Sequence, residues 1–235
     1  MSGSKKYKGR QCAYCGVTDA TTADHIFARE FFLVEDRADL PQVPACSSCN
    51  DEKSRLEHYL TALLPFGARR GASRRNLVEM VPQRLVRNAR LHRNLRDNWG
   101  KAWAKEGGAY VRTSTLPVDA EKVIDLFRRV VRGLVSFHWG TYLTGEDDVT
   151  VVAFTTAGEE YFDGLFALNV AARVRRDVGR GTFKYEGAQA ADSPRITVWR
   201  IEAYGGLKFG DPSVPGEHAS RIGALTGPLP RVREV

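Results

Sequence analysis

The sequence predicts an α+β protein in three parts, and three observations carry this prediction. All four cysteines of the 235-residue chain lie near its N-terminus, in two C-x-x-C pairs. A stretch rich in arginine follows, with leucines partly at helical spacing. The second half alternates amphipathic helical patterns with strand-like runs. We therefore divide the chain into residues 1–65, a small cysteine-stapled module, 66–107, a basic helical segment, and 108–235, an α+β domain.

The composition favours a globular protein with a polyanionic partner. Hydrophobic residues make up 43% of the chain, which is enough for a core, and the formal net charge is +7. A basic balance suits nucleic acid. No run of about eighteen apolar residues occurs, so we expect no membrane span. The N-terminus lacks the apolar core of a secretion signal, which predicts a cytoplasmic protein.

The cysteine pairs can bring four thiolates to one point. Each C-x-x-C forms a knuckle that aims two sulfur atoms at a shared ion, and two knuckles supply the four ligands of tetrahedral zinc. A reducing cytoplasm disfavours disulfides. We therefore predict a structural zinc ion, with redox-active thiols as the alternative. The expected ligands are Cys12, Cys15, Cys46 and Cys49.

A polar pair lies between the two knuckles. Asp24 and His25 stand directly before two apolar residues, and Asn50 follows the last cysteine. The interval between the pairs is longer than the roughly 15–20 residues usual in a zinc ribbon. A lone histidine is most often a core or surface residue. The neighbouring aspartate and the later asparagine favour a functional site over a purely structural zinc module.

Taken together, residues 1–65 resemble the HNH endonucleases, also called ββα-metal or His-Me finger nucleases, and in particular their four-cysteine zinc subgroup. This resemblance implies a treble-clef-like fold. A β-hairpin would carry the Asp-His pair, and the helix after it would carry the last polar ligand. The matching positions are Cys12, Cys15, Asp24, His25, Cys46, Cys49 and Asn50.

The resemblance also implies an activity, the hydrolysis of DNA phosphodiester bonds. His25 would be the general base that takes a proton from the attacking water, a task that neutral imidazole suits. Asp24 and Asn50 would hold one divalent cation, magnesium or manganese, through oxygen ligands. The zinc ion would keep the hairpin and the helix in register.

Two positions differ from the usual pattern of that family. Ala28 stands where many members have a proline, and Pro41 stands where many have the asparagine that orients the histidine. The orienting partner of His25 is therefore expected to be a backbone carbonyl or another side chain. Glu57 is a candidate because it shares a helix face with Asn50. The alternative for Glu57 is a solvated helix face.

Arginines are the candidate contacts to nucleic acid. Arg29 follows His25 by four residues and could grip a phosphate with its guanidinium fork; the alternative is an ordinary surface residue. Residues 66–107 are expected to form one or two helices with a face for the DNA backbone, or merely a solvated basic face. Trp99 and Trp103 are expected to anchor this segment to the next domain. The candidate arginines of the segment are Arg69, Arg70, Arg74 and Arg75.

The second half is expected to alternate helices and strands. Asp119 should cap an amphipathic helix over 122–137. The end of the chain, rich in glycine and proline, should be loose. This half shows no catalytic motif, so it could position DNA, bind a regulatory ligand or bind a partner. Strands are expected at 149–154, 182–186, 195–204 and 207–209, and a second helix at 158–174.

The sequence leaves three functions open: a metal-dependent DNA endonuclease, a zinc-containing nucleic-acid-binding protein without cleavage, and an RNA nuclease. The joint presence of Asp24, His25 and Asn50 favours the first, because a pure binder has no physical need for all three. A homodimer would pair two sites for double-strand cleavage, and the sequence leaves this open, along with specificity.

Overall fold

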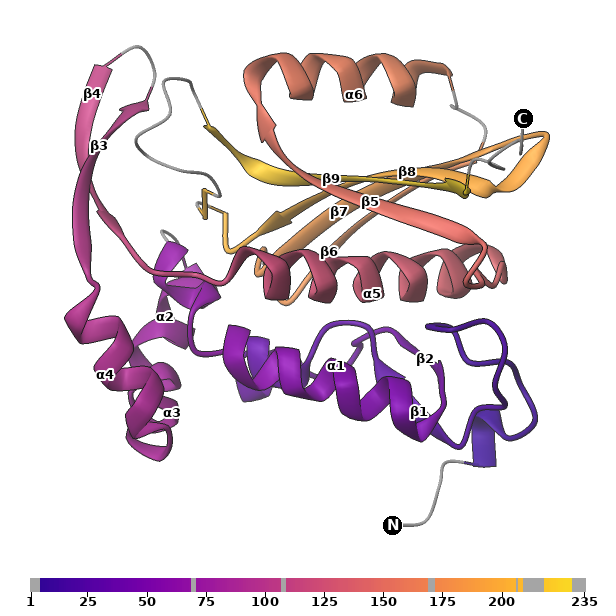
Figure 1. Cartoon of the computed structure of the whole chain (residues 1–235), viewed down its shortest axis with the longest axis horizontal. Coiled ribbons are helices and arrows are strands. Elements are labelled where there is room, and N and C mark those ends of the chain that lie inside the picture. The colour runs from indigo at the N-terminus through magenta and orange to yellow at the C-terminus, as the bar shows by residue number, and fades with distance from the viewer. Residues whose placement is uncertain are drawn as a thin grey trace, which may run out of the picture.

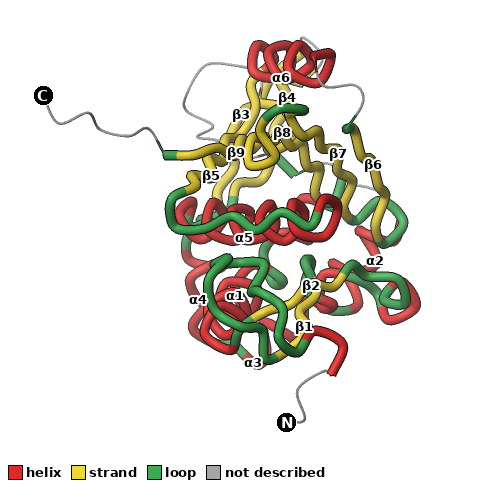
Figure 2. Tube along the Cα trace, turned by 90° about the vertical axis from the view of Figure 1, so that its right-hand side faces the viewer, coloured by secondary structure: helices red, strands yellow, loops and turns green. Residues whose placement is uncertain are grey.

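The computed structural model describes residues 5–68, 71–106, 109–168, 172–205, 207–208 and 218–229. In these ranges the chain is a mixed α+β protein built in layers, which Figures 1 and 2 show from two directions. The long helix α5 (Ala120–Trp139) lies between an N-terminal unit and a five-stranded sheet. Helix α6 (Thr156–Leu168) covers the other face of the sheet. No helix in the described ranges is long and apolar enough to cross a membrane.

The N-terminal unit is a hairpin followed by a helix. Strand β1 (Thr22–His25) pairs antiparallel with β2 (Gln42–Ala45). Helix α1 (Ser47–Leu60) begins directly after Cys46. The loop between the strands contains two short 3-10 turns. The strand–strand–helix order agrees with the expected one.

The basic segment differs from the expected one or two helices. It contains three short helices and the first strand of a hairpin. Asn88 separates the second helix from the third, and its side chain accepts a hydrogen bond from the Leu91 N–H at 3.0 Å. The elements are α2 (Gly71–Glu79), α3 (Val81–Arg87), α4 (Ala89–Asp97), β3 (Gly100–Glu106) and its antiparallel partner β4 (Ala109–Thr115).

The predicted amphipathic helix is confirmed as α5. The Asp119 side chain caps it by accepting a hydrogen bond from the Lys122 N–H at 3.3 Å. It ends at Gly140, whose φ of +66° is the left-handed conformation that glycine adopts without strain. The apolar stripe is buried, as expected. Its members include Val123, Leu126, Phe127, Val130, Val131 and Leu134.

The five-stranded sheet is antiparallel throughout, in the order β5-β9-β8-β7-β6. The expectation of a loose chain end is wrong for the last strand, which lies between β5 and β8. The predicted helix over 158–174 ends earlier, and Leu207 and Lys208 form no strand; Phe209 lies outside the described residues. The strands are β5 (Asp147–Thr155), β6 (Arg173–Val178), β7 (Phe183–Ala190), β8 (Ser193–Ala203) and β9 (His218–Pro228).

One buried cluster joins the N-terminal unit to the sheet. The rings of Phe27, Phe31 and Phe32 lie 4.6, 5.3 and 5.8 Å from the ring of Phe183 on β7. The Tyr204 hydroxyl donates to the Phe31 carbonyl at 3.0 Å. These phenylalanines connect the hairpin to the second half of the chain. The division at residues 65 and 107 stays a prediction.

Candidate functional site

The four cysteines come together as their spacing predicted. The sulfur atoms of Cys12, Cys15, Cys46 and Cys49 all lie within 4.8 Å of one another, and none forms a disulfide. The first pair comes from the loop before β1, and the second pair flanks the start of α1. Tetrahedral zinc thiolate sites separate their sulfurs by roughly 3.8 Å. The cluster therefore fits a structural zinc ion.

The thiols strongly affect one another's protonation. Burial raises the pKa of Cys49 well above its ordinary value, and the three neighbouring thiols raise it further. Burial also raises the pKa of Cys12. At Cys15 burial acts in the same direction, but the N–H groups of Thr18 and Val17 lower the pKa to about 6. Four thiolates this close repel one another, and a bound cation would remove that repulsion.

Strand pairing sets the surroundings of His25. Its cross-strand partner is Gln42, and the Gln42 Nε2 lies 2.9 Å from the His25 Nε2. Glu57, the candidate from the sequence, instead forms an ion pair with Lys53. Sequence reasoning missed Gln42. Pairing the two strands residue by residue, once the hairpin is predicted, would have placed it opposite the histidine.

The surroundings of His25 favour its neutral form. Its side chain is half-buried, and burial lowers the pKa below the ordinary value of 6.5. Asp24 acts in the opposite direction, while the charges of Arg29 and Lys53 further disfavour protonation. A neutral imidazole can accept a proton, so the residue suits general base chemistry.

A buried lysine organises the groups around the Asp-His pair. The Lys53 side chain is fully buried. Its Nζ donates to the His25 carbonyl oxygen at 2.7 Å and lies 2.9 Å from the Asp24 Oδ2. It also pairs with Glu57, whose pKa is raised to about 7 by burial despite the opposing effect of Lys53. Sequence reasoning gave Lys53 no role.

Two neighbouring side chains bind the same carboxylate oxygen of Asp24, Oδ2. The Tyr14 hydroxyl donates to Oδ2 at 2.5 Å, the same oxygen that faces Lys53. Burial, followed by the charge of Asp24, raises the pKa of Tyr14 well above its ordinary value, so the phenol keeps its proton. Within the described ranges, Oδ1 accepts no hydrogen bond. Oδ1 is therefore the oxygen that fits a divalent cation.

Asn50 lies in the first turns of α1, three residues before Lys53. Residues three apart on a helix are neighbours on one face, and Lys53 reaches β1 from that face. The side chain of Asn50 is half-buried, and no described residue hydrogen-bonds to it. No contact between described residues joins Asn50 to Asp24, so the role of Asn50 as a second cation ligand stays a prediction.

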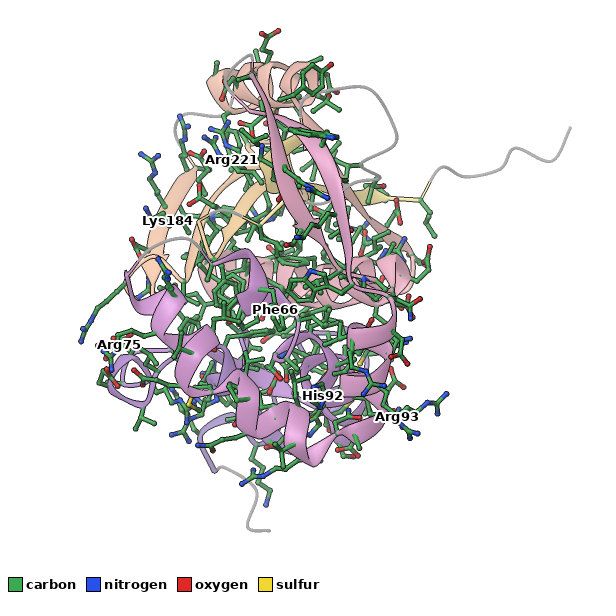
Figure 3. The ribbon with its side chains drawn as sticks, turned by 90° about the vertical axis from the view of Figure 1, so that its left-hand side faces the viewer. Phe66, Arg75, His92, Arg93, Lys184 and Arg221 are labelled. Atoms are coloured by element: carbon green, nitrogen blue, oxygen red, sulfur yellow. The ribbon has the colours of Figure 1, made fainter. Side chains whose placement is uncertain are left out.

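The arginines differ in their partners. Arg29 is exposed beside His25, close enough to influence its pKa. Arg74 is exposed on α2. Arg75 extends from the same helix (Figure 3), but it pairs with Glu35 at 2.9 Å and with Glu79 at 3.0 Å. The other two candidates, Arg69 and Arg70, lie outside the described residues.

Comparisons of this chain with family models, with curated proteins and with solved structures gave no match. The site is therefore interpreted from its own chemistry.

Proposed function

We propose that this protein is a metal-dependent endonuclease of the HNH type that hydrolyses DNA phosphodiester bonds. One observation carries the proposal: His25, which contacts Gln42 and whose pKa is lowered by burial, stands beside Asp24 on a hairpin that lies next to the four-cysteine cluster. A structural zinc module alone needs neither residue. The +7 charge of the chain supports a polyanionic substrate.

His25 acts as the general base. The oxygen of a water molecule attacks phosphorus while His25 accepts the water proton, and the bond from phosphorus to the 3′-oxygen breaks. Solvent then protonates the leaving oxygen. Asp24 and Asn50 would hold a magnesium or manganese ion, which would supply positive charge to offset the negative charge that develops during cleavage. Arg29 adds a cation beside the same histidine.

Gln42 orients the base. In the structure its amide nitrogen faces the His25 Nε2, which places the ring proton on Nδ1. A half-turn of the amide would present its oxygen instead and would hold the proton on Nε2. The lone pair of Nδ1 would then be free for the water proton. In that turned orientation Gln42 would perform the role that an asparagine performs in the family this chain resembles.

A second candidate function is a zinc-containing DNA-binding protein without cleavage. One contact favours it: the ammonium group of Lys53 already neutralises Asp24 without a divalent cation. In such a protein the basic surface would bind DNA, and His25 would have no role in catalysis.

Cleavage of supercoiled plasmid separates the two candidates. The zinc-loaded protein would be incubated with plasmid and magnesium, manganese or no added cation, and with single-stranded RNA in parallel. The endonuclease proposal predicts nicked or linear DNA only with the cation. Retained DNA binding without cleavage in any cation would contradict the proposal and favour the binder. Cleavage of RNA alone would contradict the choice of substrate.

A further inference from the structure

The hairpin of β3 and β4 is separate from the five-stranded sheet. It runs along the outer side of the molecule in Figure 1 and crosses the side that faces the viewer in Figure 3. Its base is attached: the Trp99 ring meets the Phe66 ring edge-on at 5.6 Å, and Leu116 packs on a small buried cluster. An isolated two-stranded hairpin is only marginally stable in water, so a hairpin of this length suggests a functional role.

One face of the hairpin carries large exposed aromatic rings. Trp103 is 63% exposed and Tyr110 is 71% exposed. Trp103 was expected to anchor the segment to the next domain, but most of its side chain is exposed. Among the described residues, Trp99 is 44% exposed and has an anchoring contact with Phe66.

The same face also carries cations. Trp103 pairs with Arg112 across the strands, and Lys101 pairs with Ser114. Residues directly opposite in an antiparallel pair point to the same side. We call Lys101, Trp103, Tyr110 and Arg112 the ribbon face. These four side chains combine aromatic rings with positive charge.

The ribbon face continues a basic surface. Residues 71–97, which include the three short helices before the hairpin, contain seven arginines and two acidic residues. Figure 3 shows these helices and the hairpin on one side of the molecule, with Arg93 extending outward. An open cleft of about 600 Å³ lies between α4 and the start of α5, and its lining includes Arg90, Asn94 and Lys122. This surface suits a phosphate backbone.

We propose that the ribbon face binds unpaired bases of the DNA substrate. Aromatic side chains stack on bases whose flat faces are free, and cations beside them meet the phosphates. In a duplex these base faces are covered by their neighbours, so a face that only read duplex DNA would have no use for two exposed rings. The inference rests on the proposed function for the choice of DNA, and it narrows the substrate to DNA with single-stranded segments.

Binding measurements without added divalent cation test the proposal in the absence of cleavage. The probes are a labelled oligothymidylate, a duplex of equal length, and an oligomer of equal length without bases. Trp103→Ala with Tyr110→Ala should weaken oligothymidylate binding at least about fivefold and should not change binding of the baseless oligomer. Tyr161→Ala, which removes an equally exposed ring (61%) from α6, is the matched control and should change neither.

Two further variants separate stacking from charge. Trp103→Phe should keep most of the affinity while abolishing most of the tryptophan fluorescence quenching by oligothymidylate. Lys101→Ala with Arg112→Ala should lower the slope of log affinity against log salt by about 1.4 for single strands.

Several results would overturn the inference. Equal affinity of the wild type for oligothymidylate and the baseless oligomer would show that no base stacks here. A dimer that dissociates in the Trp103→Ala, Tyr110→Ala protein while DNA binding is unchanged would identify a second copy of the chain as the occupant. If an RNA oligomer of the same sequence and length bound at least tenfold more tightly than oligothymidylate, the partner of the ribbon face would be RNA and not DNA. Failure of plasmid cleavage would leave these binding results unaffected, so the two proposals fail separately.

Discussion

The polar residues around His25 each come from a different part of the N-terminal unit. Gln42 comes from β2, Lys53 from α1 and Tyr14 from the loop between the first two cysteines. Gln42 and Tyr14 each make one contact with the Asp-His pair and Lys53 makes two, all at 2.9 Å or less. Position and protonation at this site therefore depend on residues that only the fold brings near.

The role of Gln42 can be tested through the pH dependence of cleavage. Gln42→Ala should lower the single-turnover rate roughly 10- to 100-fold, as loss of a residue that orients a functional side chain usually does. In the wild type the acid limb of the rate profile should lie below pH 6.5, because burial lowers the pKa of His25.

Gln42→Glu tests whether the acid limb follows the pKa of His25. A carboxylate beside the imidazole favours its protonated form and raises its pKa, so the acid limb should move to higher pH. An acid limb that stays in place in Gln42→Glu would show that His25 is not the titrating group.

Lys53 should dominate the stability of the N-terminal unit. Lys53→Met leaves Asp24 and Glu57 buried without their cation, which should lower the free energy of unfolding by about 3–5 kcal/mol. Denaturant titration at pH 7 measures this effect. Lys122→Met removes a surface lysine from an exposed pair and should cost less than about 1 kcal/mol. Equal losses in the two variants would contradict the buried network.

At the scale of elements, the sequence predicted correctly those helices and clusters whose signals lie within their own residues. The cap and the apolar stripe of α5 both lie within its own residues, so periodicity sufficed. The clustering of the four cysteines followed from their spacing alone. The last strand could not be predicted this way, because it contains Gly223 and Gly227, which resemble loop residues. Gly223 is required by tertiary packing: a Cβ there would lie 2.3 Å from the Phe154 ring.

A substitution in the four-cysteine cluster tests the prediction of a structural zinc ion. Cys46→Ser should lose most of the one zinc ion expected per chain and lower the melting temperature by at least roughly 10 °C, because structural zinc contributes folding free energy directly. Elemental analysis and thermal unfolding measure the two effects. Ser47→Ala changes the adjacent exposed position and should keep both values. A Cys46→Ser protein with wild-type stability and no zinc would refute a structural role.

At the scale of the whole molecule, the layers share one core. The cluster that contains Phe27 and Phe31 also contains Phe183 and Tyr204, and α5 touches both layers. Gly133 of α5 allows this approach, since a Cβ there would lie 3.2 Å from Ile26 and 3.4 Å from the Tyr14 ring. No local pattern predicts such contacts, because they join residues more than a hundred positions apart.

The shared core predicts a single unfolding transition. Zinc release and loss of the sheet should coincide on heating, and Phe183→Ala should destabilise both together by about 3–5 kcal/mol. Leu168→Ala, at an exposed position, is the control and should have little effect. Circular dichroism followed in parallel with a zinc-sensitive dye reports the two events. Two separate transitions would contradict the account of one core.

We propose His25 as the base of a nuclease site. Plasmid cleavage by His25→Ala, compared with His58→Ala on the exposed side of α1, tests it most directly. We predict a loss of at least roughly 100-fold for His25→Ala with zinc content and melting temperature unchanged, and wild-type cleavage for His58→Ala. Cleavage by His25→Ala at the wild-type rate would contradict the claim.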